Sequence, residues 1–503
     1  MPSLKSLKQL SPIKSSIYLV LVITIIRLLV IGFPELTNDE AQYALYGYYL
    51  DWSYFDHPPL VGWLNSLVLL ISDSDFVLRL WPILLSALSA FLIYRLSREI
   101  FPNLPERVAF YAVALFQIPV ILQALGMVML PDTPLIPVLL SIALVLFRVC
   151  REQSKYSWLG LGLLFGIAGL SKYTAITIVP SVILVIVLFQ NSKIIFTPWP
   201  WLAIALAAIV VSPVLIWNVQ HDWISIEYQL SHGIPDRSWQ LKRMLESQLG
   251  QVIAFSPIIF IVGWLAMARA IFNSKIYADA TTVFGIRYLS IFALPVLLLF
   301  GFNGGYEHSL LHWTAAAWAI LIPVVAAQLY ISWAAWGLRV ITYLSIVYSV
   351  VLVLILHSLL VFNWLPFDKN KEKNKYPLYD IIGWQQVASR AVQLRTELIA
   401  STKNSNLKLF IGNWSMFSRL AWYARPVPVV ITDRRQGQSD LWYGTAQMGD
   451  SGIVVVPPKY SDQAQVNGTA KFKSCHLIET VESKIRNKTA ASYQLFYCKL
   501  YKG

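Results

Sequence analysis

Eleven apolar segments, most of them long enough to cross a bilayer, constrain the fold of this chain more than any other feature. They cover residues 15–33, 77–96, 107–128, 132–150, 156–170, 173–190, 199–218, 251–272, 286–303, 312–330 and 337–362. A membrane-spanning α-helix needs about 20 consecutive apolar residues. Only 13% of the residues are charged, whereas soluble domains have about 25%. We therefore expect an α-helical, polytopic membrane protein with about eleven spans.

The net charge of +13 comes from lysines and arginines that cluster in alternate loops. The clusters are Lys5 to Lys14, Arg95 with Arg98, Arg148 with Arg151 and Lys155, Lys193, and Arg269 with Lys275. Such residues concentrate in cytoplasmic loops, which predicts a multi-pass protein of the plasma (inner) membrane with a cytoplasmic N-terminus. The first segment lacks a small-x-small cleavage site before Pro34, which favours a retained span over a signal peptide. No nucleic-acid partner is expected, because no basic patch adjoins a recognisable binding motif.

A change in composition near residue 366 predicts a transmembrane domain over 1–365 and a second domain over 366–503. Residues 368–375 form a charged stretch that is typical of a linker. The second part contains helix-like segments at 383–400 and 416–423, and strand-like segments at 407–411, 427–431 and 452–456. This alternation predicts a small extracytoplasmic α/β C-terminal domain.

The three cysteines match no zinc or redox spacing. Cys150 is expected in the core of a span. Cys475 and Cys498 fall in the predicted outer domain, where an oxidising compartment would let them pair. Separate free thiols stay open as the alternative, because the sequence does not place their Cα atoms.

Polar side chains suited to chemistry collect in the loops predicted to lie outside the cell. Asp39 and Glu40 follow the first apolar segment, and His57-Pro58-Pro59 ends the same loop. Asp132 and Lys172 lie in the next two outer turns. The outer loop before the tenth apolar segment contains Tyr306, Glu307, His308 and His312.

The residues after Glu40 have the spacing of a helix with an aromatic face. Tyr43, Tyr46 and Leu50 fall on one side of it, which predicts contact with the lipid–water interface. Adjacent helical residues point about 100° apart, so Asp39 and Glu40 are not both expected to face inward.

Each of these polar residues also has a purely structural explanation. A carboxylate such as Asp132 is commonly solvated, and a lysine such as Lys172 commonly extends to the headgroups. His308 and His312 have the i, i+4 spacing that suits a metal, and Glu307 lies close by. A hydrogen-bonded interfacial histidine pair explains them without a third ligand. We expect no strict cofactor requirement and leave a divalent cation open.

Several segments together resemble a known family. Asn38-Asp39-Glu40 followed by His57-Pro58-Pro59-Leu60 is similar to the first loop of dolichyl-phosphate-mannose protein mannosyltransferases and bacterial aminoarabinose transferases. Residues 130–135, 169–172 and 212–223 resemble further family segments, and Arg434-Arg435-Gln436 resembles bacterial members with an outer domain. The resemblance implies a GT-C fold.

The resemblance also implies an inverting glycosyltransferase that moves a sugar from a polyprenyl-phosphate donor. Its acceptor would be a hydroxyl or phosphate on a lipid, glycan or protein, and membrane lipids would surround the enzyme. Asp39 and Asp132 are the implied catalytic acids, and Lys172 is the implied cation facing the phosphate. The other polar residues predicted to bind donor or acceptor are Glu40, His57, Tyr306, Glu307 and His308. The C-terminal part departs most from the family, so the sugar and the acceptor stay open.

These residue types suit the chemistry by themselves. Displacement at an anomeric carbon needs a base for the incoming hydroxyl, and a carboxylate such as Asp39 can accept that proton. A cation such as Lys172 can offset the charge that develops on the departing phosphate. The sequence contains no glycine-rich nucleotide fingerprint and no P-loop, which favours a lipid-linked donor.

Two other classes of protein compete with the enzyme. A transporter or flippase of lipid-linked sugars would need charged or broken helices near the bilayer midplane, whereas Asp and Glu lie mainly in loops here. A scaffold subunit would use its outer domain to bind partners and leave Asp39 without a task.

Overall fold

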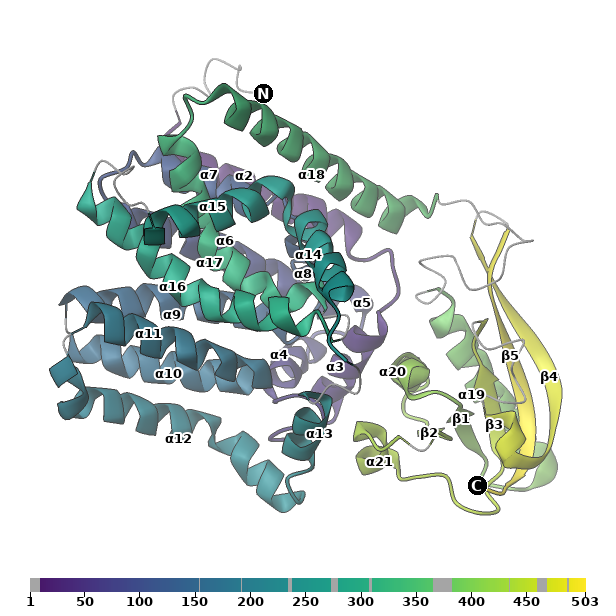
Figure 1. Cartoon of the computed structure of the whole chain (residues 1–503). Coiled ribbons are helices and arrows are strands. Elements are labelled where there is room, and N and C mark those ends of the chain that lie inside the picture. The colour runs from purple at the N-terminus through teal and green to yellow at the C-terminus, as the bar shows by residue number, and fades with distance from the viewer. Residues whose placement is uncertain are drawn as a thin grey trace.

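The protein has a large helical part and a smaller C-terminal α/β part that lie side by side (Figure 1). The computed structural model describes residues 10–152, 154–190, 192–233, 238–272, 279–306, 310–364, 382–433, 435–458, 468–485 and 488–503. The predicted boundary at residue 366 and the predicted linker at 368–375 lie outside these residues.

The helical part begins with α2 and ends with α18. Its α-helices are α2 (Pro12–Val30), α3 (Asn38–Tyr48), α4 (Leu60–Leu69), α5 (Asp75–Leu78), α6 (Leu80–Ile100), α7 (Arg107–Phe116), α8 (Val120–Leu125), α9 (Asp132–Glu152), α10 (Lys155–Ser171), α11 (Val179–Phe189), α12 (Pro198–Gln220), α13 (Ile224–Gly233), α14 (Leu241–Phe255), α15 (Pro257–Phe272), α16 (Ala280–Asn303), α17 (Ala315–Ile331) and α18 (Trp336–Phe362). Short 3-10 helices are η1 (Tyr173–Ile178), η2 (Ser192–Phe196) and η4 (Leu311–Thr314).

The described residues contain seven helical runs long and apolar enough to cross a membrane, or eight if a bent pair counts as one span. The expected membrane protein is therefore confirmed, whereas about eleven spans are not. The bent pair is α14 and α15, which meet at 112° at Ser256. The segment at 107–128 divides into α7 and α8 before Pro119, and the segment at 173–190 begins as a 3-10 helix. Apolar composition predicts burial in these places but not an unbroken helix.

A buried arginine fills the break between α7 and α8. The Arg27 guanidinium on α2 donates to the side chains of Gln123 (2.9 Å) and Ser86 (2.7 Å), and also to that of Gln117 (3.5 Å). A polar group inside a bilayer needs such partners, because no water is present to replace them. Arg27 therefore stabilises a broken helix that the apolar pattern does not reveal.

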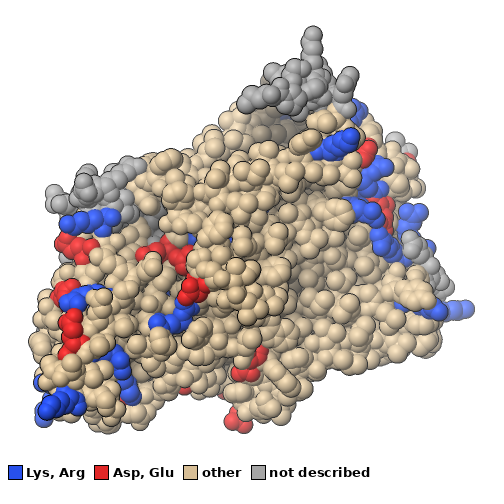
Figure 2. Space-filling view, turned by 180° about the vertical axis from the view of Figure 1, so that it is seen from behind, with Lys and Arg blue, Asp and Glu red and all other residues tan. Residues whose placement is uncertain are grey.

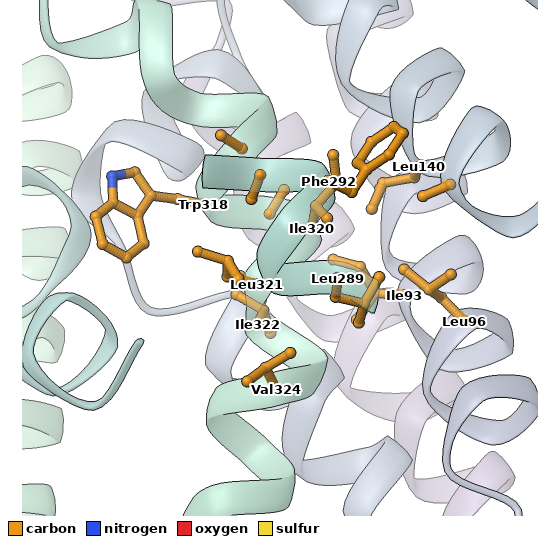
Figure 3. Packing of buried hydrophobic residues seen from close by; sticks show 14 of the residues in the cluster. Ile93, Leu96, Leu140, Leu289, Phe292, Trp318, Ile320, Leu321, Ile322 and Val324 are labelled. Atoms are coloured by element: carbon orange, nitrogen blue, oxygen red, sulfur yellow. The ribbon is translucent and has the colours of Figure 1, made fainter. Parts of the chain in front are cut away.

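Helix α17 is the centre of the helical core. All of its residues from Ala315 to Leu329 are buried, and it packs on α7, α9, α15 and α16. Figure 3 shows Ile320 of α17 beside Phe292 of α16 and Leu140 of α9. Since α17 begins next to His312, this packed helix fixes the position of that side chain.

Close packing of α10 on α12 fixes the next part of the site. A Cβ atom on Gly162 of α10 would lie 2.4 Å from the carbonyl oxygen of Ala203 on α12. Small residues allow such an approach between helices in a membrane. Lys172 follows α10 directly, so this contact helps to fix the turn that carries it.

The C-terminal part contains one five-stranded sheet in the order β2-β1-β3-β5-β4. Its elements are α19 (Trp384–Thr402), β1 (Lys408–Ile411), α20 (Trp414–Tyr423), β2 (Val429–Ile431), α21 (Gln438–Tyr443), β3 (Gly452–Val456), η7 (Thr469–Lys471), β4 (Phe472–Ile485) and β5 (Lys488–Tyr501). Strands β1, β2 and β3 are parallel, and the β4–β5 hairpin continues the sheet in the antiparallel sense. The predicted α/β elements are confirmed.

Cys475 and Cys498 form a disulfide bond. They lie opposite each other in the antiparallel pairing of β4 and β5. The structure thus decides between the two alternatives that the sequence left open. Cys150 is a free thiol in the helical part.

The two parts meet at the end of the helical part that carries α3. Glu35 accepts a hydrogen bond from the backbone N–H of Trp384 (2.7 Å), where α19 begins. Tyr423 of α20 donates to Asp75 (2.7 Å), and α20 packs on α3. The α3 helix is therefore enclosed by protein and does not lie at the lipid surface.

Candidate active site

The first turn of α3 sets the direction of two neighbouring carboxylates. The Thr37 side chain accepts a hydrogen bond from the Glu40 N–H, and the Glu40 carboxylate accepts one from the Thr37 N–H. This capping box satisfies N–H groups that would otherwise lack partners at a helix end. It holds Glu40 on one side of the helix, so Asp39 points to another side.

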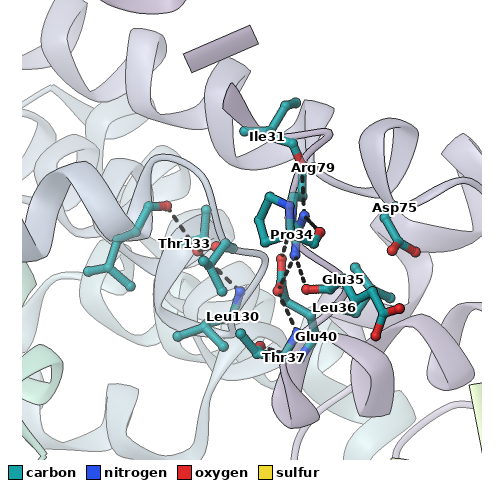
Figure 4. A network of polar contacts seen from close by, with 12 residues as sticks. Ile31, Pro34, Glu35, Leu36, Thr37, Glu40, Asp75, Arg79, Leu130 and Thr133 are labelled. Carbon is teal, nitrogen blue, oxygen red and sulfur yellow. Dashed lines mark hydrogen bonds and ion pairs between the residues drawn. The ribbon is translucent and has the colours of Figure 1, made fainter. Parts of the chain in front are cut away.

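Glu40 lies in a buried ion pair with Arg79 (Figure 4). The guanidinium donates to both oxygens of the Glu40 carboxylate, at 2.7 and 2.8 Å. Its other N–H groups donate to the backbone carbonyls of Ile31, Pro34 and Glu35. Protein groups therefore already occupy both oxygens of Glu40, which assigns this carboxylate a structural part in holding Arg79, while its predicted role in binding donor or acceptor stays a prediction.

Asp39 faces a cleft between α3 and the C-terminal part. The cleft contains about 580 Å³ of empty space. Side chains from both parts line it: Asn38, Asp39, Gln42, Tyr43, Phe55, Asp56, Tyr228, Trp414, Phe417, Ser418, Ile431, Arg435, Gln436, Gln438 and Ser439. The cleft is thus large enough for a small polar group and has carboxylates in its wall.

Asp39 remains open to this cleft although protein surrounds it. Desolvation raises the pKa of its carboxyl, and the nearby charges of Asp56 and Glu40 raise the pKa further. A carboxylate with a raised pKa binds a proton more readily than an ordinary aspartate. Asp39 therefore has the properties of a general base.

Lys172 and Asp132 form a second buried ion pair behind the cleft. The Lys172 ammonium donates to both oxygens of Asp132, at 2.9 and 2.8 Å. His312 Nε2 lies 3.6 Å from the same carboxylate, and the Trp313 ring centroid lies 5.9 Å from Lys172 Nζ. Both members of the pair are about 5% exposed. The structural alternatives of a solvated Asp132 and a Lys172 that extends to the headgroups are therefore excluded.

His57 connects the cleft with this ion pair. Its ring packs edge-on against Tyr43, and its Nδ1 atom is buried with no hydrogen-bond partner among the described residues. Burial lowers the pKa of the imidazole, and the charges that act on it come from Asp56, Lys172 and Asp132. His57 therefore lies near the charges of Asp56 and Asp132 and has a ring nitrogen that no described protein group uses.

The structure does not bring every predicted residue to this cluster. The backbone carbonyl of Tyr306 accepts a hydrogen bond from Arg243 (2.9 Å), and its ring packs on Phe302. Glu307 and His308 lie outside the described residues, so their predicted roles stay predictions. Within the described ranges, no group of three His, Cys, Asp or Glu side chains has the arrangement of a metal site.

The aromatic face of α3 has a different role from the predicted one. Tyr43 and Tyr46 are buried, with Tyr46 stacked on Tyr54 at 3.7 Å between ring centroids. Tyr46 donates a hydrogen bond to Asp56. The predicted contact with the lipid–water interface is wrong for both tyrosines, because the first loop and the C-terminal part cover this face.

Two cleft residues were not among the predicted site residues. Asp56 directly precedes the quoted His57-Pro58-Pro59 motif, and this position next to a predicted site residue is the sequence signal that could have identified it. Arg435 belongs to the quoted Arg-Arg-Gln segment. Its guanidinium stacks 3.6 Å from the Trp414 ring and donates to Tyr228 (2.5 Å). Nothing in the local sequence tells that Arg435 reaches Tyr228, which is 207 residues away.

Comparisons with known proteins agree with this architecture. Residues 56–217 match the family model described as dolichyl-phosphate-mannose-protein mannosyltransferase. The apo crystal structure of ArnT from Cupriavidus metallidurans matches with a TM-score of 0.62 and 14% identity, over 97% of this chain and 98% of that chain. The chain has the fold of this GT-C glycosyltransferase. The GT-C fold that the sequence motifs implied is confirmed, and the family model matches the segment that contains several of those motifs.

One further protein, and a second structure of the same ArnT, are also similar to this chain. Lipid A galacturonosyltransferase RgtD from Rhizobium johnstonii is 25% identical over 327 residues, which cover 64% of this chain. The matched region spans 66% of RgtD, just under two thirds of its length. The structure of the Cupriavidus metallidurans ArnT bound to undecaprenyl phosphate matches with a TM-score of 0.63 and 12% identity, over 95% of this chain and 97% of that chain.

Proposed function

We propose that this protein transfers a sugar from a polyprenyl-phosphate donor to a hydroxyl or phosphate of an acceptor. The observation that carries the proposal is the placement of Asp39 in the cleft, near the Lys172–Asp132 pair. The charges of both Asp56 and Lys172 act on the Asp39 carboxyl, so a base and a cation belong to one site. The names of the matched relatives, a lipid A galacturonosyltransferase and an ArnT with bound undecaprenyl phosphate, support the same chemistry.

In the proposed reaction, Asp39 accepts the proton of the acceptor hydroxyl. The acceptor oxygen forms a bond to the anomeric carbon while the bond from that carbon to the phosphate oxygen breaks. A single displacement of this kind inverts the anomeric configuration. A positioned general base contributes about 10²–10⁴-fold to such a step.

Lys172 stabilises the departing phosphate in this proposal. Two of its N–H groups are directed to Asp132, which leaves the third for a donor oxygen. Asp132 then serves as a positioning residue for Lys172, because both of its oxygens already accept hydrogen bonds from that ammonium. His57 offers a further hydrogen bond to the phosphate or the sugar.

An apolar pocket next to this pair suits the lipid part of the donor. It extends from Asp132 and Trp313 along apolar residues such as Ile136 and Phe300, and these side chains would have to move apart to admit a prenyl chain. A prenyl chain in this pocket would place its phosphate near Lys172. The cleft on the other side of Asp39 would then receive the acceptor.

We place the site on the extracytoplasmic side of the membrane. On the face shown in Figure 2, a broad and mostly uncharged region separates the charged side chains on the left from a group on the right in which Lys and Arg outnumber Asp and Glu. This distribution favours a cytoplasmic location for the group on the right. The Cys475–Cys498 disulfide in the C-terminal part also favours an oxidising compartment.

The test compares Asp39→Asn with Asp73→Asn in purified protein supplied with a polyprenyl-phosphate sugar. Asp73 is an exposed carboxylate in the same region, paired with Arg425, and serves as the matched control. We expect Asp39→Asn to lose about 10²–10⁴-fold in turnover and Asp73→Asn to keep it. Near-normal turnover of Asp39→Asn would show that the carboxylate is idle, as the scaffold alternative requires. Parallel reactions with EDTA, and with Mg²⁺, Mn²⁺ or Zn²⁺ restored, test the expectation that no metal is strictly needed.

A further inference from the structure

A large apolar groove lies at the end of the helical part opposite the candidate active site. It contains about 1310 Å³ of empty space between α7, α17 and α18. Helix α17 begins beside His312 and ends at Ile331, and its 17 residues span about 25 Å. The groove residues Tyr330 and Trp333 lie at the far end of this helix, so the groove does not belong to the sugar-transfer site.

The lining of this groove changes from apolar to polar toward the end of the helices. Tyr111, Trp333 and Tyr343 line it and are partly exposed on their outer sides. Tyrosine and tryptophan commonly occupy the depth at which lipid headgroups meet acyl chains. These three rings therefore place the mouth of the groove near a membrane surface.

One arginine lines this mouth, and a second lies one helical turn from a lining residue. Arg107 lines the groove, donates to the Tyr330 hydroxyl (2.9 Å) and lies over its ring at 5.0 Å. Arg339 is exposed on α18 one turn before Tyr343, so the two share a face of that helix. No described carboxylate forms an ion pair with Arg107 or Arg339. The mouth of the groove thus carries positive charge that the described part of the chain does not neutralise.

We propose that this groove binds one anionic phospholipid of the leaflet opposite the candidate active site. An acyl chain would lie against α17 and α18, and the phosphate would contact Arg107 and Arg339. The apolar lining suits an acyl chain, and the two arginines favour an anionic lipid over a neutral one. A polyprenyl-phosphate donor with its phosphate at Lys172 has its charged end at the other side of the membrane, so it does not satisfy these arginines.

Lipid retention by the full-length protein tests the proposal. The purified protein is mixed with phosphatidylglycerol or with phosphatidylcholine of the same acyl chains, and bound lipid is counted by native mass spectrometry. We expect the wild type to retain one phosphatidylglycerol in preference to phosphatidylcholine. Arg107→Gln with Arg339→Gln should lower the retention of phosphatidylglycerol by about fivefold for each arginine lost.

Two further variants separate the groove from general surface charge. Ala114→Phe places a ring inside the groove and should displace both lipids. Arg151→Gln removes a cation from the same end of the helical part, on α9 and outside the groove, and should leave retention unchanged. The proposal is overturned if the double arginine variant retains phosphatidylglycerol as the wild type does. Equal retention of the two lipids by the wild type would overturn it as well.

Discussion

Two buried ion pairs lie near the cleft, Glu40–Arg79 and Asp132–Lys172, and they differ in how many N–H groups of the cation have an acceptor within the protein. Arg79 directs its N–H groups to Glu40 and to three backbone carbonyls. Lys172 directs two N–H groups to Asp132 and has Trp313 and His312 nearby instead of backbone acceptors. The first pair is complete without a ligand, whereas the second leaves a donor for one. Both pairs are buried, so burial alone does not tell a structural ion pair from a functional one. The number of N–H groups that have no acceptor within the protein does distinguish them.

The largest expected effect follows from breaking the complete pair. Glu40→Ala should lower the free energy of unfolding by about 3–5 kcal/mol, because it leaves Arg79 charged and unpaired in a buried site. Thermal unfolding in detergent measures this loss. Asp73→Ala removes an exposed carboxylate and should change the melting temperature little. An unchanged melting temperature for Glu40→Ala would remove the distinction between the two pairs.

Neutralising the incomplete pair should affect activity instead of stability. Lys172→Met combined with Asp132→Asn removes both charges together, so no buried ion is left without a partner. We expect kcat/KM for a polyprenyl-phosphate sugar to fall by about 10²–10³-fold, as for the loss of a group that stabilises a leaving oxyanion. The melting temperature should stay near that of the wild type. Normal activity in this folded double variant would contradict the phosphate contact.

A conservative change at the same position should give an intermediate result. Lys172→Arg keeps the positive charge but presents a planar group with a different hydrogen-bonding geometry. We expect partial activity that lies between the wild type and the neutral double variant. A titration of the donor at fixed acceptor distinguishes weaker binding from slower turnover. Full activity of Lys172→Arg would mean that charge alone matters at this position.

A smaller effect is expected in the pH dependence of activity, which depends on Asp39. Because desolvation and the Asp56 charge raise the pKa of Asp39, activity should be lost on acidification at a higher pH than for an ordinary aspartate. Asp56→Asn removes one of the negative charges that raise this pKa. The acidic limb of the kcat/KM profile should therefore move to lower pH in that variant. If the acidic limb of the Asp56→Asn profile stays at the wild-type pH, a group other than Asp39 is responsible for the loss of activity.

The smallest expected effect concerns the contact between the two parts. Glu35→Gln keeps the size of the side chain but removes the charge from its hydrogen bond to the Trp384 N–H. We expect a loss of about 1 kcal/mol, typical of a charge at a helix N-terminus. Hydrogen exchange at the start of α19 would report it. Slower exchange there in the variant would contradict the prediction.

The sequence predicts the class of the fold well, but it does not predict where the membrane helices are interrupted. Long apolar segments such as 337–362 coincide with single helices, because length and composition suffice there. Strand β5 alternates buried and half-buried residues from Ala491 to Tyr497, and only part of this alternation is visible in the sequence, because Phe496 is apolar although it is one of the half-buried residues. Strand β4 carries little such signal, because most of its side chains are exposed at the sheet edge.

The candidate site divides in the same way. Asp39, Asp132 and Lys172 were found because carboxylates and a lysine stand out beside apolar segments. The ion-pair partner of Glu40 was not found, since Arg79 lies 39 residues away and only the folded chain joins them. The Arg435–Tyr228 contact across 207 residues was missed for the same reason. Sequence patterns identify unusual residues, whereas their partners depend on tertiary packing.

The capping box at Thr37 has a consequence for how this site tolerates insertions. One step along α3 separates the acid that is sealed against Arg79 from the acid that faces the cleft, and a step turns the helix by about 100°. The register of the helix relative to its N-cap therefore determines which of the two positions faces Arg79 and which faces the cleft. A residue inserted between Thr37 and Asp39 would move Asp39 to the position that Glu40 now has, so that the Asp39 side chain would point toward Arg79. The same few atoms that begin the helix therefore decide which carboxylate can take part in chemistry.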